Sequence, residues 1–89
     1  MIEGKTSTGF EYSIDESRLD DQELLDYLTD IMEQTDSTAT TKAIRKLFPD
    51  NAERKALYDH VRTEDGRVPT EALWNEIQAI MDGVEAGKK

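Results

Sequence analysis

The chain has 89 residues and a formal net charge of −9, with 36% hydrophobic and 35% charged residues. This length suits one small domain that buries roughly 60–65% of its unfolded surface. Because there is no cysteine, disulfides, thiolate nucleophiles and cysteine metal sites are excluded. No apolar run approaches the ~18–20 residues of a membrane-spanning helix, and the first residues lack the apolar core of a signal peptide. These features are compatible with a cytosolic protein.

The charge is unevenly distributed along the chain. Residues 1–36 hold eleven acids and two bases, residues 37–63 hold six bases and three acids, and residues 64–89 hold six acids and three bases. An acidic total disfavours duplex DNA as a partner, because phosphate contacts dominate that affinity. Complementary potentials steer and orient protein partners. The pattern therefore favours a protein partner or self-association over nucleic acid.

The N-terminal segment has the pattern of a β-hairpin. Phe10, Tyr12 and Ile14 alternate with polar residues, which is the period of a strand. Residues 5–9 are polar and would form the loop to a short preceding strand. A lone hairpin is marginal in water, so we expect a hairpin within residues 1–16 that packs on helices.

The first helix is expected at about residues 21–34. Asp20 is placed to cap it, with Glu23 three residues later at the capping-box position. Apolar side chains at three-to-four spacing should form one face toward the core. This stripe comprises Leu24, Leu25, Leu28, Ile31 and Met32.

A second, shorter helix should follow the polar residues 35–41 and end at Phe48, because the residue before Pro49 avoids helical geometry. Ser37 or Thr38 would cap it. The pattern directs four apolar side chains inward and three basic side chains outward. The inward set is Ala43, Ile44, Leu47 and Phe48, and the outward set is Lys42, Arg45 and Lys46.

Two further helices complete the predicted domain. Asp50 should cap the third helix, which buries Ala56, Leu57 and Val61 and is broken by Gly66. Thr70 should cap the fourth helix and Gly83 should end it, with residues 85–89 frayed. Its inward residues would be Leu73, Trp74, Ile77, Ile80, Met81 and Val84. The fold class is thus a single mainly α domain of four helices, with residues 17–84 as the helical core and a short N-terminal β-hairpin.

No residue set suited to catalysis stands out. His60 is the only histidine, and its nearest carboxylates in the sequence are Asp59 and Glu64. A metal site needs several convergent ligands, and a nucleophile needs an activating base. We therefore expect a non-enzymatic protein without catalytic residues, metal or cofactor.

Six residues are candidates for binding a partner. Trp74 lies beside the apolar stripe of the fourth helix, and a partly exposed tryptophan is a typical interface hot spot. Ile77 and Met81 would share this surface. The basic side chains Lys42, Arg45 and Lys46 would either balance the acidic first helix or dock an acidic partner.

The order of these segments carries a family resemblance. Gly9-Phe10-Glu11-Tyr12 is followed by the Asp-rich Leu19–Leu25, by Ala43–Leu47, by Ala56–Arg62, and by Asp65–Pro69 before a final amphipathic helix. This order resembles the small tail assembly chaperones of long-tailed bacteriophages and prophages of Gram-positive bacteria. The second helix ends here in Leu47-Phe48-Pro49, which departs from the family's usual leucine-rich end.

The resemblance implies a function and a partner. Such chaperones bind the tape measure protein and keep it soluble in the bacterial cytoplasm while the tail tube assembles, and they are absent from the mature virion. A longer form made by translational frameshifting would recruit the tail tube protein, and Gly87-Lys88-Lys89 can be encoded by a slippery heptanucleotide. The alternative is a small acidic regulatory or adaptor protein whose first helix mimics nucleic acid toward a basic partner.

Overall fold

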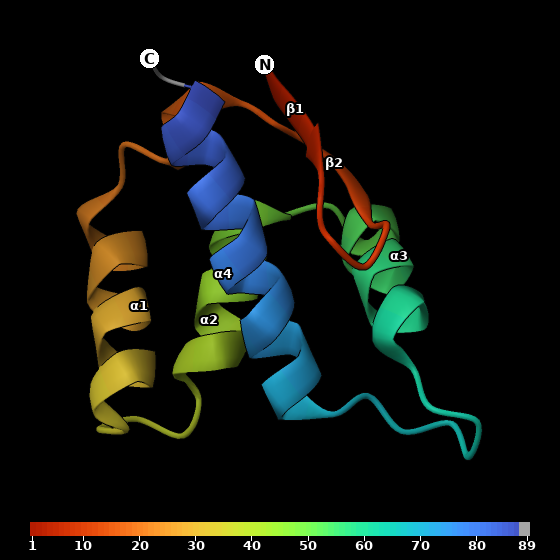
Figure 1. Ribbon diagram of the computed structural model, residues 1–89. Coiled ribbons are helices and arrows are strands. Elements are labelled where there is room, and N and C mark those ends of the chain that lie inside the picture. Colours follow the sequence, from red (N-terminus) through yellow and green to blue (C-terminus); the bar gives the residue numbers. More distant parts are fainter. Residues whose placement is uncertain (88–89) are drawn as a thin grey trace.

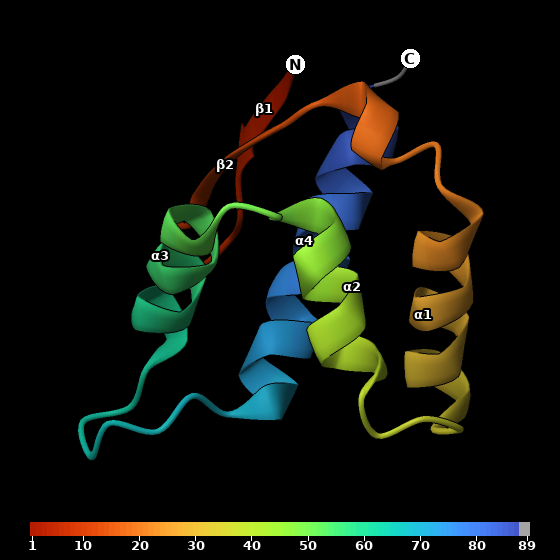
Figure 2. The ribbon, with the colours of Figure 1, turned by 180° about the vertical axis from the view of Figure 1, so that it is seen from behind.

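The computed structural model describes residues 1–87, with side chains up to Val84. The predicted class is confirmed, because four helices follow a two-stranded antiparallel hairpin (Figure 1). The elements are β1 (Ile2–Lys5), β2 (Glu11–Ile14), a short 3-10 helix η1 (Glu16–Arg18), α1 (Gln22–Glu33), α2 (Ala39–Leu47), α3 (Asn51–Val61) and α4 (Thr70–Gly87). Helix α4 lies in the middle, with α3 and the hairpin to one side and α1 to the other. Helix α2 covers the back of α4, as Figure 2 shows.

The hairpin turns one face toward α4. Its register pairs Ile2 with Ile14 and Gly4 with Tyr12. The turn is closed by the Thr6 amide, which donates to the Phe10 carbonyl at 2.9 Å. Phe10, Tyr12 and Ile14 are all buried, as the alternation in the sequence predicts. The hairpin thus contributes a wall of the core.

Gly83 does not end α4, contrary to the sequence prediction, and instead leaves room for the side chain of Tyr12. A Cβ on Gly83 would lie 2.3 Å from the Tyr12 hydroxyl oxygen, and a Cβ on Gly4 would lie 2.4 Å from the same atom. The tyrosine ring therefore lies between a strand and a helix that both lack side chains at the contact. The helix continues to Gly87, three residues into the segment predicted to fray. Lys88 and Lys89 of the expected tail lie outside the described residues.

Two of the predicted caps are displaced by one residue. Asp21, not Asp20, caps α1, and its carboxylate accepts from the Glu23 amide at 2.9 Å. Asp50 caps α3 as predicted. Thr70 is the first residue of α4 rather than the cap before it. Because an Asp-Asp pair offers two equivalent caps, the sequence cannot distinguish them.

The start of α2 uses an aspartate that the sequence analysis did not consider. Thr38 occupies the cap position but makes no side-chain capping bond. Instead, Asp36 accepts hydrogen bonds from the Thr38 amide at 2.8 Å and from the Thr38 hydroxyl at 2.7 Å. These bonds and Lys42 lower the pKa of Asp36 to about 2, with the Thr38 hydroxyl as the largest cause. The polar linker is therefore ordered before α2 begins.

The core collects side chains from the four α-helices and β2, and from the adjacent residues Phe10 and Phe48. The buried apolar residues are Phe10, Tyr12, Ile14, Leu24, Ala39, Ala43, Ile44, Leu47, Phe48, Leu57, Leu73, Ile77, Ile80 and Val84. In α3 only Leu57 is fully enclosed, and Val61 is partly buried. The prediction that Ala56 is buried is wrong, because successive helical side chains diverge by about 100° and Leu57 takes the inward direction.

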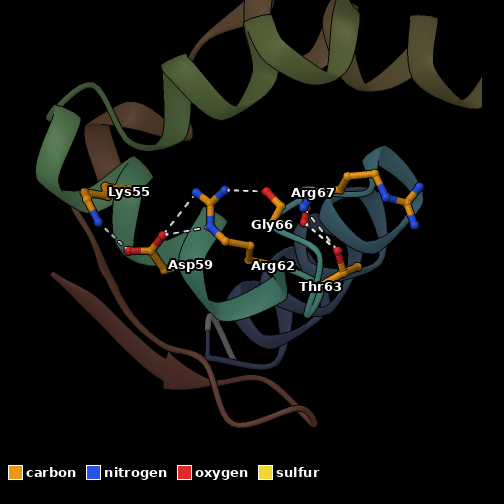
Figure 3. A network of polar contacts seen from close by, with 6 residues as sticks. All are labelled: Lys55, Asp59, Arg62, Thr63, Gly66 and Arg67. Carbon is orange, nitrogen blue, oxygen red and sulfur yellow. Dashed lines mark hydrogen bonds and ion pairs between the residues drawn. The ribbon is translucent and has the colours of Figure 1, made fainter.

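Helix α3 ends earlier than predicted. Figure 3 shows the polar contacts in the connection from α3 to α4. The Arg62 guanidinium contacts the Asp59 carboxylate at 3.2 Å and donates to the Gly66 carbonyl at 2.8 Å. Arg62 itself is extended, so α3 ends at Val61. Gly66 has a φ of 90°, but it shapes the following turn, where its amide donates to the Thr63 carbonyl at 3.0 Å. Gly66 therefore does not end the helix.

Candidate binding groove between helices α1 and α4

An apolar groove of about 540 Å³ lies between α1 and α4. The two helices stand side by side, with α4 nearer the viewer in Figure 1. The walls are mostly apolar and come from both helices. The lining residues are Leu25, Leu28 and Met32 of α1, and Trp74, Ile77, Gln78, Met81 and Asp82 of α4.

The groove exists because α2 covers only part of the apolar stripe of α1. Helix α1 packs on α2, which fully buries Leu24 and partly buries Leu28 and Ile31. Leu25 remains 48% exposed and Met32 73% exposed. The prediction of one inward stripe is therefore wrong for these two side chains. Contiguous exposed apolar residues typically mark an interaction site.

Helix α4 supplies the opposite wall with the predicted apolar binding residues. Trp74 and Met81 are partly buried, and Ile77 is fully buried at the base of the groove. Trp74 and Met81 are seven residues apart, which places them on one face about two turns apart. The structure thus brings together Trp74, Ile77 and Met81, and adds Leu25 and Met32 from α1.

All charged residues of the two helices that flank the groove are acidic. Helix α1 carries four acids and no base, and the described α4 also carries four acids and no base. Asp82 lines the groove itself. Within residues 1–87, no ion pair engages Asp26, Glu33, Glu71 or Asp82. The surroundings of the groove therefore carry negative charge that the described bases leave uncompensated.

The predicted basic residues lie on a different surface. Lys42, Arg45 and Lys46 surround a separate hollow of about 300 Å³ that also includes Tyr27. The Lys42 ammonium lies 5.7 Å from the centre of the Tyr27 ring. None of the three lines the groove, so the six residues predicted to bind a partner lie on two separate surfaces.

Ion pairs within the chain engage two of these bases. Lys46 lies 3.0 Å from Asp21 and 3.1 Å from Glu23, and Lys42 lies 3.1 Å from Asp36. The hydrogen bond from Lys46 is the largest cause of the lowered pKa of Asp21, and Asp21 in turn raises the pKa of Lys46. Lys46 therefore balances acids at the N-terminal end of α1, whereas Lys42 pairs with an acid of the linker that follows α1.

A buried polar cluster on the other side of α4 was not predicted. Glu76 is only 3% exposed and accepts hydrogen bonds from the hydroxyls of Thr6 at 2.9 Å and Thr8 at 2.8 Å. The Nε2 atom of His60 lies 2.9 Å from the Thr8 hydroxyl and 3.8 Å from the Glu76 carboxylate. The cluster joins the hairpin loop, α3 and α4. No sequence signal pairs residues that are 52 to 70 positions apart.

Two other features that would suggest a function are absent from residues 1–87. No three metal-binding side chains converge there, and none of its helices is both long and apolar enough to cross a membrane. In comparisons with protein-family models, curated proteins and solved structures, the chain has no significant match. The groove between α1 and α4 is therefore the feature on which a functional proposal can be built.

Proposed function

We propose that the protein is a non-enzymatic phage tail assembly chaperone that binds and solubilises the tape measure protein during tail tube assembly. It would act in the cytoplasm of the bacterial host. The observation that carries the proposal is the apolar groove, where Leu25 and Met32 remain exposed beside Trp74 and Met81. The family resemblance of the sequence supplies the identity of the partner.

The groove has the chemistry that such a client needs. A long helical client exposes apolar faces that it cannot bury alone, and an amphipathic helix can lay such a face into an apolar groove. Full burial of a leucine or methionine side chain contributes about 1.5–3 kcal/mol. Association costs roughly 4–15 kcal/mol, so one short groove binds weakly. Weak binding at many places along a long client suits a chaperone that must later be displaced.

Coexpression with a tape measure protein tests the proposal. The fraction of that protein in the soluble lysate should rise with the wild-type chain and fall to the level without chaperone for the double variant Leu25→Ser, Met32→Ser. Ala56→Ser is the control, because Ala56 is also exposed but lies on α3. A soluble fraction that is the same with and without the chain would refute the proposal.

The acidic surface also favours a second candidate, an adaptor that binds a basic protein by mimicking nucleic acid. Such a complex depends on charge, so it should dissociate as salt screens the acids. It should not depend on Met32. Salt-sensitive binding of a basic DNA-binding protein that survives Met32→Ser would therefore favour the adaptor over the chaperone.

The proposal includes a longer form made by frameshifting, which would recruit the tail tube protein. The codons of Gly87-Lys88-Lys89 and the bases beyond them test this part separately. A slippery heptanucleotide followed by an open shifted frame is expected. Codons that cannot slip would remove the longer form while leaving the groove proposal to stand on its own experiment.

A further inference from the structure

We infer that the groove between α1 and α4 selects an amphipathic helix whose apolar face is flanked by lysine and arginine side chains. This inference rests on the proposed function and specifies the chemistry of the segment that is bound. It comes from the charge and geometry of the groove rather than from the family resemblance.

The length of the groove sets how much helix it can hold. Asp82 lies eight positions after Trp74 in α4, and Met32 lies seven positions after Leu25 in α1. At 1.5 Å per residue, each wall is about 11–12 Å long. A helix lying along such a wall presents about two turns. Its contacts would therefore come from three or four apolar side chains at positions i, i+3, i+4 and i+7.

The negative charge near the groove determines which charged side chains of the bound helix should flank its apolar face. Asp82 lines the groove. On α1, the exposed acids Asp26 and Glu33 directly follow the lining residues Leu25 and Met32 in the sequence. No base from residues 1–87 forms an ion pair with these three acids. A bound helix with glutamates beside its apolar face would bring like charges together, whereas lysines or arginines there would be attracted and held in register.

A second copy of the chain fits the groove less well. The exposed apolar side chains Leu25 and Met32 lie on α1, which carries acids only. Groove-to-groove pairing would therefore place acidic helices against each other, which is unfavourable. The basic helix α2 directs Ala43, Ile44 and Leu47 into its own core. It has no apolar face left to offer a second copy.

Two synthetic peptides of about 15 residues test the inference with the full chain. Both carry the same leucine stripe with i, i+3, i+4, i+7 spacing, but one is flanked by lysines and the other by glutamates. Neither contains tryptophan. Trp74 is the only tryptophan of the protein and lines the groove, so its emission reports binding directly. We expect the lysine peptide to bind at least tenfold more tightly at low salt, with the difference shrinking as salt is added.

Matched variants locate the effect. Asp82→Asn should weaken the lysine peptide about two- to fivefold, the scale of one exposed ion pair. Glu64→Gln removes the same charge from the exposed loop before α4 and should leave the affinity unchanged. Met32→Ser should weaken both peptides, because both would use the apolar wall.

The outcomes separate the inference from the function on which it rests. Equal binding of the two peptides would overturn the charge selection while leaving helix binding intact. Failure of both peptides to bind would count against both proposals. If sedimentation showed a dimer that Met32→Ser makes monomeric, and no peptide bound, the groove would belong to a second copy and the inference would be wrong.

Discussion

The close approach of Tyr12 to Gly83 leads to a prediction for Gly83→Ala. Whether this substitution stabilises or destabilises the protein should depend on the hydroxyl oxygen of Tyr12. In an ordinary helix, replacing an interior glycine by alanine stabilises the helix by about 1 kcal/mol. In this chain the new Cβ of Gly83→Ala would lie 2.3 Å from the Tyr12 hydroxyl oxygen but 3.6 Å from the ring carbon that carries it. The clash therefore involves the hydroxyl, because 3.6 Å is an ordinary carbon–carbon contact.

The tyrosine has little room to withdraw. Its ring is buried, and Gly4 on the opposite strand approaches the same hydroxyl. Overpacking a well-packed site costs roughly 1–3 kcal/mol, which cancels or exceeds the helix-propensity gain of about 1 kcal/mol. Gly83→Ala should therefore change the free energy of unfolding by between about 0 and 2 kcal/mol in the destabilising direction.

The Tyr12→Phe background provides the control. Without the hydroxyl, Gly83→Ala should stabilise the protein by about 1 kcal/mol, which raises the melting temperature by roughly 4–8 °C for a domain of this size. The four proteins form a double-mutant cycle, read by urea unfolding with circular dichroism, and the expected coupling is about 1–3 kcal/mol. If Gly83→Ala stabilised both backgrounds equally, the steric reasoning would be wrong.

Three further predictions concern polar groups. The pKa of Asp36 is lowered from 3.8 to about 2, so its contribution to stability is present above pH 3.8 and is lost as the pH falls toward 2; acid unfolding of Asp36→Asn should therefore lack this component. Asp50→Ala should cost about 1 kcal/mol in urea unfolding because α3 loses its cap, whereas Asp50→Asn should cost little. Glu76→Ala should cost about 1–3 kcal/mol, because the hydroxyls of Thr6 and Thr8 lose their acceptor, and Glu76→Gln, which keeps an acceptor oxygen, should cost less in thermal unfolding.

Local patterns were sufficient where the determinants lie close together in the sequence. The alternation of Phe10, Tyr12 and Ile14 predicted both strand and buried face, and all three side chains are in the core. Pro49 marked the end of α2, which stops at Leu47. In these segments the burial pattern and the backbone preference agree, so each element can be predicted without knowing its neighbours.

Predictions were wrong where the answer depends on a distant partner. Gly83 has the local properties of a helix end, and only the approach of Tyr12 from β2 shows that it is a packing position. Glu76 was not singled out in the sequence, because glutamates are rarely buried, yet hydroxyls of the hairpin loop satisfy its carboxylate. Periodicity assigned Met32 to the core face of α1, but how much of that face is covered depends on where α2 lies.

The same limit applies to the candidate site. Periodicity placed Trp74, Ile77 and Met81 on one face of the last helix, and the structure keeps them together. The opposite wall comes from Leu25 and Met32, which are far away in the sequence. Lys42, Arg45 and Lys46 formed a cluster in the sequence because they are close neighbours there, and the fold places them around another hollow.

In the folded chain the charges are unevenly distributed over the surface: some acids have basic partners, and others have none within residues 1–87. Lys46 of α2 pairs with Asp21 and Glu23 at the start of α1, and Lys42 pairs with Asp36 in the linker after α1. Farther along α1, Asp26 and Glu33 have no basic partner within residues 1–87, and they flank the segment where apolar side chains are exposed. A basic amphipathic helix would be attracted to these acids and would cover the apolar walls in the same step. Charge and hydrophobicity in the groove therefore favour the same kind of partner.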